Sequence, residues 1–379
     1  MHRVTIILGI CLFLLVAIVE AQARWQCEEQ IIQDVQWSPD GTRLAVMTLQ
    51  GVLFYDADMQ LQQTVVAPQS IFDQTSLTGI VWSPDSQWVV LPDHVSPDDA
   101  ERGVQGWSIA NAETGELRAI LDPFQMSVRS RIQELVWSPD NNFLLALKYP
   151  PPFGNPPPYS ELLLFPALLD GGFSPVTNRF SDVGISHLRW DETGITGQVE
   201  GLQFQFETPE LTFSDTFPIL RERWWRLSPD GTREAAFISI EGFVLRDTTP
   251  DTIEHWVSLF PTVNTTGDIL FPAQVSEIVW TTDSQRIVAV YAPILTNNPQ
   301  VEIYPDMPFV LQGSVVDAVS NIEIHHFFLQ DTVPVRQYSV SPSGERVVTV
   351  REDGVLVWWH PLTDEKLGEV IVGDTSWCA

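Results

Sequence analysis

Residues 35–44 read VQWSPDGTRL, and similar stretches return at 81–90 (VWSPDSQWVV), 136–145 (VWSPDNNFLL) and 226–235 (RLSPDGTREA). Weaker copies begin at Arg189, Val279 and Ser339. In each clear copy an apolar stretch is followed by a Ser-Pro-Asp turn and a second apolar stretch. Proline presets φ at the first central position, aspartate suits the second, and glycine takes the left-handed position that follows. Each copy therefore predicts a tight β-hairpin.

The residue before the turn marks seven copies, spaced 37 to 60 residues apart: Trp37, Trp82, Trp137, Trp190, Leu227, Trp280 and Val340. A third apolar stretch follows the hairpin, as in 51–56 (GVLFYD), and a fourth follows a polar turn, as in 363–372. Four short strands that recur at this spacing are typical of propeller blades. We therefore predict an all-β, seven-bladed propeller of four-stranded antiparallel blades, with the five marker tryptophans buried between blades. The blades are expected to begin near residues 31, 77, 131, 184, 221, 274 and 334.

Residues 341–372 (SPSGERVVTVREDGVLVWWHPLTDEKLGEVIV) resemble a WD repeat, and so do residues 38–66. The Ser-Pro-Asp-Gly copies are also similar to the TolB-like propeller repeats of bacterial envelope proteins. This resemblance covers nearly the whole chain and implies the propeller fold. No copy has the Gly-His pair of WD repeats, and Tyr55-Asp56, Arg246-Asp247 or Trp359-His360 replace the terminal Trp-Asp. The buried His-Asp network of that family is therefore not transferred to this chain.

The first residues have the pattern of a secretory signal. His2 and Arg3 precede an apolar run of about 16 residues, and the triplet Ala21-Gln22-Ala23 favours cleavage before Arg24. The run is shorter than the roughly 20 residues of a spanning helix. We therefore predict a signal peptide at 1–23, a propeller at 24–379, a secreted or periplasmic location and no membrane insertion after cleavage.

The charge balance is strongly acidic, with 49 Asp and Glu against 20 Lys and Arg and a net charge of −29. A surface of this sign repels phosphate backbones and anionic lipid headgroups, which argues against nucleic-acid partners. Cys27 and Cys378 lie near the two ends of the expected mature chain. In an oxidising compartment they are predicted to form a disulfide across the blade junction that has no peptide connection.

No common catalytic motif is present: there is no G-x-S-x-G, H-E-x-x-H, Walker loop or C-x-x-C. We therefore assign no catalytic, cofactor or metal residue and expect a protein that is not an enzyme and needs no cofactor. Adjacent His325 and His326 should point to opposite sides of an extended segment, which disfavours a metal site. The alternative is a saccharide hydrolase or lyase that uses carboxylates at the central channel. The sequence does not select the acids.

Long connections are expected on one face of the propeller, because the first-to-second hairpins on the other face are all short. The stretch 149–159 (YPPPFGNPPPY) is the most distinctive of these connections. Polyproline is pre-extended, and Tyr149, Phe153 and Tyr159 offer apolar surface at low entropic cost. The leading prediction is a monomeric, non-enzymatic binding or scaffold protein that contacts a protein or peptide through this face.

Overall fold

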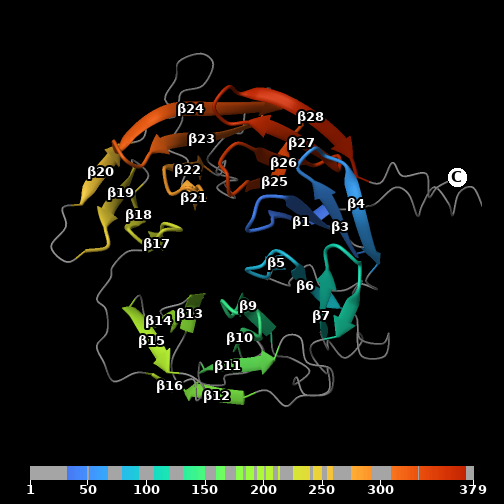
Figure 1. Cartoon of the computed structure of the whole chain (residues 1–379), viewed down its shortest axis with the longest axis vertical. Coiled ribbons are helices and arrows are strands. Elements are labelled where there is room, and N and C mark those ends of the chain that lie inside the picture. Colours follow the sequence, from blue (N-terminus) through green and yellow to red (C-terminus); the bar gives the residue numbers. More distant parts are fainter. Residues whose placement is uncertain are drawn as a thin grey trace, which may run out of the picture.

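The computed structural model shows an all-β ring (Figure 1). It describes residues 32–372 apart from the segments 49–50, 67–78, 94–105, 120–130, 150–158, 167–175, 182–184, 192–193, 200–201, 208–211, 214–224, 240–241, 250–253, 259–274, 292–308 and 332. The described strands form seven four-stranded antiparallel sheets, and each sheet is built from four consecutive strands. The prediction of an all-β propeller with four-stranded blades is confirmed. We number the sheets as blades 1 to 7 in chain order.

The strands have the following bounds. Blade 1 contains β1 (Ile32–Trp37), β2 (Arg43–Thr48), β3 (Gly51–Asp56) and β4 (Leu61–Val66). Blade 2 contains β5 (Val81–Trp82), β6 (Trp88–Asp93), β7 (Gly106–Asn111) and β8 (Leu117–Ala119). Blade 3 contains β9 (Arg131–Trp137), β10 (Phe143–Tyr149), β11 (Tyr159–Pro166) and β12 (Val176–Ser181). Blade 4 contains β13 (Ile185–Asp191), β14 (Gly194–Val199), β15 (Leu202–Glu207) and β16 (Thr212–Phe213).

The remaining three blades complete the ring. Blade 5 contains β17 (Trp225–Leu227), β18 (Arg233–Ser239), β19 (Gly242–Asp247) and β20 (His255–Ser258). Blade 6 contains β21 (Val275–Trp280), β22 (Arg286–Tyr291), β23 (Phe309–Asp317) and β24 (Ile322–Asp331). Blade 7 contains β25 (Val335–Val340), β26 (Val347–Arg351), β27 (Val355–His360) and β28 (Glu365–Ile371). The first strand of each blade lies nearest the ring axis and the fourth lies at the rim (Figure 1).

The turn between the first two strands has the expected chemistry. Asp140 accepts a hydrogen bond from Ser138 Oγ at 2.5 Å, and Ser138 Oγ in turn accepts from the Phe143 N–H at 2.9 Å. The Ser138 hydroxyl and Asn142 lower the pKa of Asp140, as an ionised acceptor requires. The fourth turn residue has a positive φ in six blades: Gly41, Ser86, Asn141, Gly231, Ser284 and Gly344. The turn therefore demands the left-handed conformation even where glycine is absent.

These turns also connect neighbouring blades. The Asp40 N–H donates to Ser86 Oγ of the next blade at 3.0 Å, and the Asp230 N–H donates to Ser284 Oγ at 3.1 Å. Asn141 accepts from Asp85 in the same way at 3.3 Å. The side chain at the left-handed position thus satisfies a backbone donor of the preceding blade.

Four of the five marker tryptophans are buried as predicted: Trp37, Trp82, Trp137 and Trp280. In the last three the indole Nε1–H donates to a carbonyl of the preceding blade's inner strand, at 2.9 Å from Trp280 to Arg226. The prediction was wrong for Trp190, which is only half-buried and stacks on Phe143, a residue that is itself exposed. Blade 4 has Asp-Glu-Thr-Gly in place of the Ser-Pro-Asp turn, so its hairpin differs at this point.

Blades 1 and 7 close the ring through a shared apolar cluster. Val35, Trp37 and Tyr55 of blade 1 pack with Leu356 and Trp358 of blade 7. The Tyr55 and Trp358 rings meet edge to face with centroids 6.2 Å apart. No described blade combines strands from both ends of the chain, so contacts between the side chains and strands of two separate blades close this junction.

The packing between blades 1 and 2 can be tested with Phe54, which is fully buried and meets the Trp82 ring edge to face at 5.6 Å. We expect Phe54→Ala to lower the free energy of unfolding by about 3–5 kcal/mol, because a large cavity would form between the blades. Val66→Ala, at an exposed position of β4, is the control and should change stability by less than about 0.5 kcal/mol. Urea unfolding followed by tryptophan fluorescence measures both, and equal effects would contradict this packing.

Candidate functional site

Polar side chains recur three residues before the marker position on the inner strands. Asp34, Glu134 and Glu277 supply carboxyl groups at this position, and Gln337 supplies an amide. In blades 1, 6 and 7 the pairing with the second strand shifts register just before this residue, and blade 3 shifts in the same region. A β-bulge redirects side chains and breaks the regular pairing. The bulge therefore gives this position its own orientation toward neighbouring blades.

Two of these acids are used as links between blades. Asp34 accepts hydrogen bonds from the Val35 N–H at 2.8 Å and, through its other oxygen, from the Ile80 N–H of blade 2 at 2.5 Å. Glu134 Oε2 accepts from the Leu188 N–H of blade 4 at 2.6 Å. Burial raises the pKa of Asp34, while the bonds from Ile80 and Val35 lower it. Both oxygens of Asp34 are thus engaged by backbone donors.

Gln337 makes the corresponding link at the junction of blades 7 and 1. Its Nε2 donates to the carbonyl of Gln33, and Ser339 Oγ accepts the Trp37 N–H at 3.2 Å. The Nε1 of Trp37 is buried without a hydrogen-bond partner. The junction therefore replaces the indole-to-carbonyl bond of other blades by two side-chain bonds to the inner strand of blade 1.

Glu277 is the chemically distinct member of this set. Burial raises its pKa to about 7, the negative charge of Asp34 adds to the increase, and Arg226 of blade 5 opposes it. Asp34 belongs to blade 1 and Glu277 to blade 6, so the two charges act on each other between the inner strands on either side of blade 7. A carboxyl group that titrates near neutral pH can give or take a proton. Glu277 is thus the inner-strand acid suited to acid–base work.

Sequence reasoning did not single out these residues. The signal was present in the repeat alignment, because an acid or amide stands at the same offset before the marker in blades 1, 3, 6 and 7. The role of this acid or amide depends on the β-bulge and on the neighbouring blade, and the sequence of a single strand reveals neither.

The predicted partner-binding loop is anchored on blade 3. Tyr149 ends β10 and Tyr159 begins β11, and Phe153 lies outside the described residues. At the base of the loop Lys148 Nζ lies 2.8 Å from Glu161 Oε2, and these two residues are register partners. The Lys148 side chain is buried, so the ion pair is shielded from water. The paired ends of β10 and β11 therefore form a fixed stem on the face opposite the Ser-Pro-Asp turns.

Two other predictions lie outside the described residues. These are the signal peptide at 1–23 and the Cys27–Cys378 disulfide. Within the described segments, no group of three or more His, Cys, Asp or Glu residues is placed to hold a metal ion. In those same segments no helix is long and apolar enough to cross a membrane.

His325 and His326 point to different sides, as expected. His325 Nε2 lies 3.1 Å from Asp364 Oδ1 of blade 7, whereas His326 Nδ1 lies 3.2 Å from Glu323 Oε1 in its own strand. The two rings therefore serve separate contacts and do not converge on one site.

Comparison with known proteins adds information on the fold. No protein-family model matches the chain, and no curated protein matches its sequence. Among solved structures, an oligogalacturonate lyase from Vibrio parahaemolyticus is 12% identical with a TM-score of 0.53, covering 87% of this chain and 89% of that one. The Cps50 (Swd1) β-propeller domain from Myceliophteria thermophila is 10% identical with a TM-score of 0.51, covering 86% and 94%.

A chain of the mitotic checkpoint complex is similar in the same way, at 13% identity and a TM-score of 0.51, with 88% and 91% covered. The fold is a β-propeller with WD40-type neighbours. These similar structures include both enzymes and assembly components, so they show the fold and do not select an activity.

The titration of Glu277 has a consequence for stability. Its pKa in the folded chain, about 7, exceeds its ordinary value of 4.5, so the protonated group favours folding. This contribution is complete below pH 4.5 and is lost as the pH rises through 7. We expect Glu277→Gln to match the unchanged protein near pH 4.5 and to be more stable at pH 8.5, by on the order of 2 kcal/mol after solvent screening.

Unfolding midpoints measured across this pH range test the expectation. Glu345→Gln, at an exposed turn position, is the matched control and should follow the unchanged protein at every pH. A Glu277→Gln protein whose midpoint parallels that of the control at every pH would show that folding does not raise the pKa of Glu277.

Proposed function

We propose that this protein is a non-enzymatic binding or scaffold protein that acts outside the cytoplasm and contacts a protein or peptide through the 149–159 loop. The observation that carries the proposal is the rigid stem of this loop. Lys148 and Glu161 form a shielded ion pair in register, so the ends of the loop are held by paired strands. Binding loops on a rigid scaffold lose little entropy on association.

The use of polar groups in the described core supports this proposal. Asp34 and Glu134 accept backbone N–H groups of neighbouring blades, and the turn hydroxyls do the same at the ring face. These groups connect neighbouring blades, so their oxygens are already used as hydrogen-bond acceptors within the ring. Connections held by a rigid scaffold are common positions for binding residues.

Replacement of residues 150–158 by a Gly-Ser linker of equal length tests the proposal. We expect the melting temperature to change by less than about 2 °C, because surface loop changes cost little when no core is lost. Partners captured from the protein's own extracellular fraction should be lost with this variant. The matched control replaces 94–105, the corresponding connection of blade 2, and should retain them. A large drop in melting temperature, or capture that survives, would contradict the proposal.

A second function is favoured by one specific observation. Glu277 has a pKa of about 7 and lies near Asp34 and Arg226, a combination that suits a carboxylate-based saccharide hydrolase or lyase at the ring axis. One observation argues against this function. A glycosidase needs a second carboxylate beside the acid, but both oxygens of Asp34 already accept backbone hydrogen bonds.

This alternative predicts turnover of acidic or neutral oligosaccharides that disappears in Glu277→Gln. Product release can be followed by the absorbance of new unsaturated ends for a lyase or by reducing ends for a hydrolase. Glu345→Gln is again the control. Turnover that persists at the same rate in Glu277→Gln would remove Glu277 as the acid or base.

A further inference from the structure

The outer edge of β24 (Ile322–Asp331) differs from the other rim strands. It is the fourth strand of blade 6, pairs with β23 on one side, and has no strand on its other side among the described residues. It contains 10 residues, against 7 in β28, 6 in β4 and 4 in β20. Figure 1 shows β24 along the rim between β20 and β28. Among the described residues no strand pairs with the backbone on that side, and a long edge of this kind can accept a further strand.

Three of the four exposed side chains of β24 are apolar, and the fourth is Gln330 near its end. The exposed fractions are 61% for Ile322, 47% for Ile324 and 37% for Phe328, and Val319 in the turn before β24 is 67% exposed. Proteins usually protect an edge strand with lysine, proline or short length. The β24 sequence, IEIHHFFLQD, contains neither lysine, arginine nor proline.

The two acids of β24 do not protect the edge, because both turn toward the sheet. Glu323 accepts a hydrogen bond from Ser314 Oγ and its side chain is only 5% exposed. Asp331 is similarly buried and lies 3.6 Å from an Arg351 nitrogen of blade 7. In contrast, β28 keeps Glu365, Lys366 and Glu369 in solvent, as its exposure pattern shows. The β24 edge therefore lacks charges against strand addition.

The charge of the molecule indicates the partner's chemistry. With a net charge of −29, a second copy of this chain is repelled, whereas a basic segment is attracted and steered. Trp256 of β20, 47% exposed, stands on the neighbouring rim strand that contacts β24. Its ring face can accept a lysine or arginine side chain by a cation–π contact.

We propose that the edge of β24 binds an extended peptide segment of alternating apolar and basic residues, which adds to blade 6 as a fifth strand. Its backbone pairs with the free edge, and its apolar side chains cover Ile322, Ile324 and Phe328. Its basic residues are attracted by the net negative charge of the chain, and one of them contacts the Trp256 ring. This surface lies in blade 6, whereas the 149–159 loop belongs to blade 3, so the two sites are independent.

The test uses the full chain and a fluorescein-labelled nine-residue peptide of alternating lysine and valine. Fluorescence anisotropy should show saturable binding that weakens at least tenfold in Ile324→Lys, whose new charge blocks the edge. Ile371→Lys, at an exposed position of β28, adds the same charge elsewhere on the rim and should change the affinity by less than twofold.

Two further peptides separate strand pairing from simple charge attraction. A peptide with the same lysines and with proline at two valine positions cannot donate those backbone hydrogen bonds, and it should bind at least tenfold more weakly. A glutamate–valine peptide should not bind. Equal binding of the proline peptide, equal loss in both lysine variants, or a dimer of this chain that Ile324→Lys dissociates would each overturn the proposal. The variant with residues 150–158 replaced should bind the lysine–valine peptide unchanged, which separates this outcome from that of the proposed function.

Discussion

The ring depends on polar links between successive inner strands, which the repeat places at fixed offsets from its marker residue. One link runs from the marker indole to a backbone carbonyl of the preceding blade, as from Trp280 to Arg226. A second runs from the backbone of the following blade to an acid three residues before the marker, as from Ile80 to Asp34. A third joins the turns, as from the Asp40 N–H to Ser86. Because buried backbone N–H and C=O groups need hydrogen-bond partners, these links hold neighbouring blades at hydrogen-bonding distance from one another.

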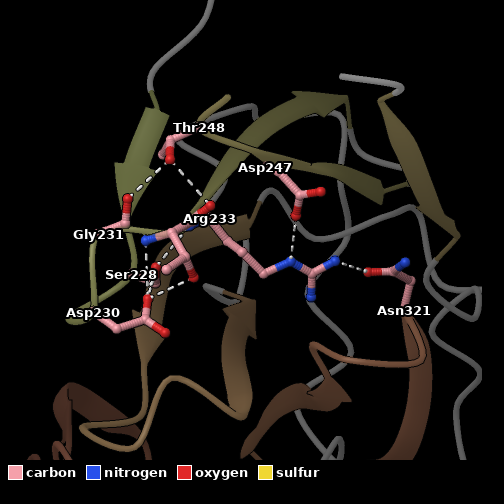
Figure 2. A network of polar contacts seen from close by, with 8 residues as sticks. Ser228, Asp230, Gly231, Arg233, Asp247, Thr248 and Asn321 are labelled. Atoms are coloured by element: carbon pink, nitrogen blue, oxygen red, sulfur yellow. Dashed lines mark hydrogen bonds and ion pairs between the residues drawn. The ribbon is translucent and has the colours of Figure 1, made fainter. Parts of the chain in front are cut away.

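Figure 2 shows how the same turns extend this linkage outward in blade 5. Ser228 Oγ donates to Asp230 and accepts from the Arg233 N–H, which fixes the turn. The Arg233 side chain then joins Asp247 of its own blade, at 3.2 Å, to Asn321 of blade 6, also at 3.2 Å. One residue next to the turn thus ties two strands of one blade to the outer turn of the next.

The acidity of the chain has different meanings in different places. Asp34, Glu134 and Glu323 are withdrawn from bulk solvent and accept hydrogen bonds, so they act as structural acceptors. Among the described residues, acids such as Asp58, Glu113 and Glu365 are exposed at turns and rims, where they contribute to the negative surface field. Glu277 differs from both groups, because it is an inner-strand acid whose pKa is raised to about 7. The burial of Glu323 leaves the exposed apolar side chains of β24 without a nearby charge from that residue.

The repeat alone determined the fold class and the strand order of each blade, because the turn chemistry and the alternation of apolar residues are local properties. It also indicated burial of Trp37, Trp82, Trp137 and Trp280, since a large apolar residue at a recurring strand end has one place to pack. The tertiary structure alone decided the roles of Asp34, Glu134 and Glu277, because their partners come from other blades and their orientation follows from a bulge. It likewise decided that Trp190 is half-buried and that β24 is open, since exposure is set by neighbouring blades and cannot be read from a single strand.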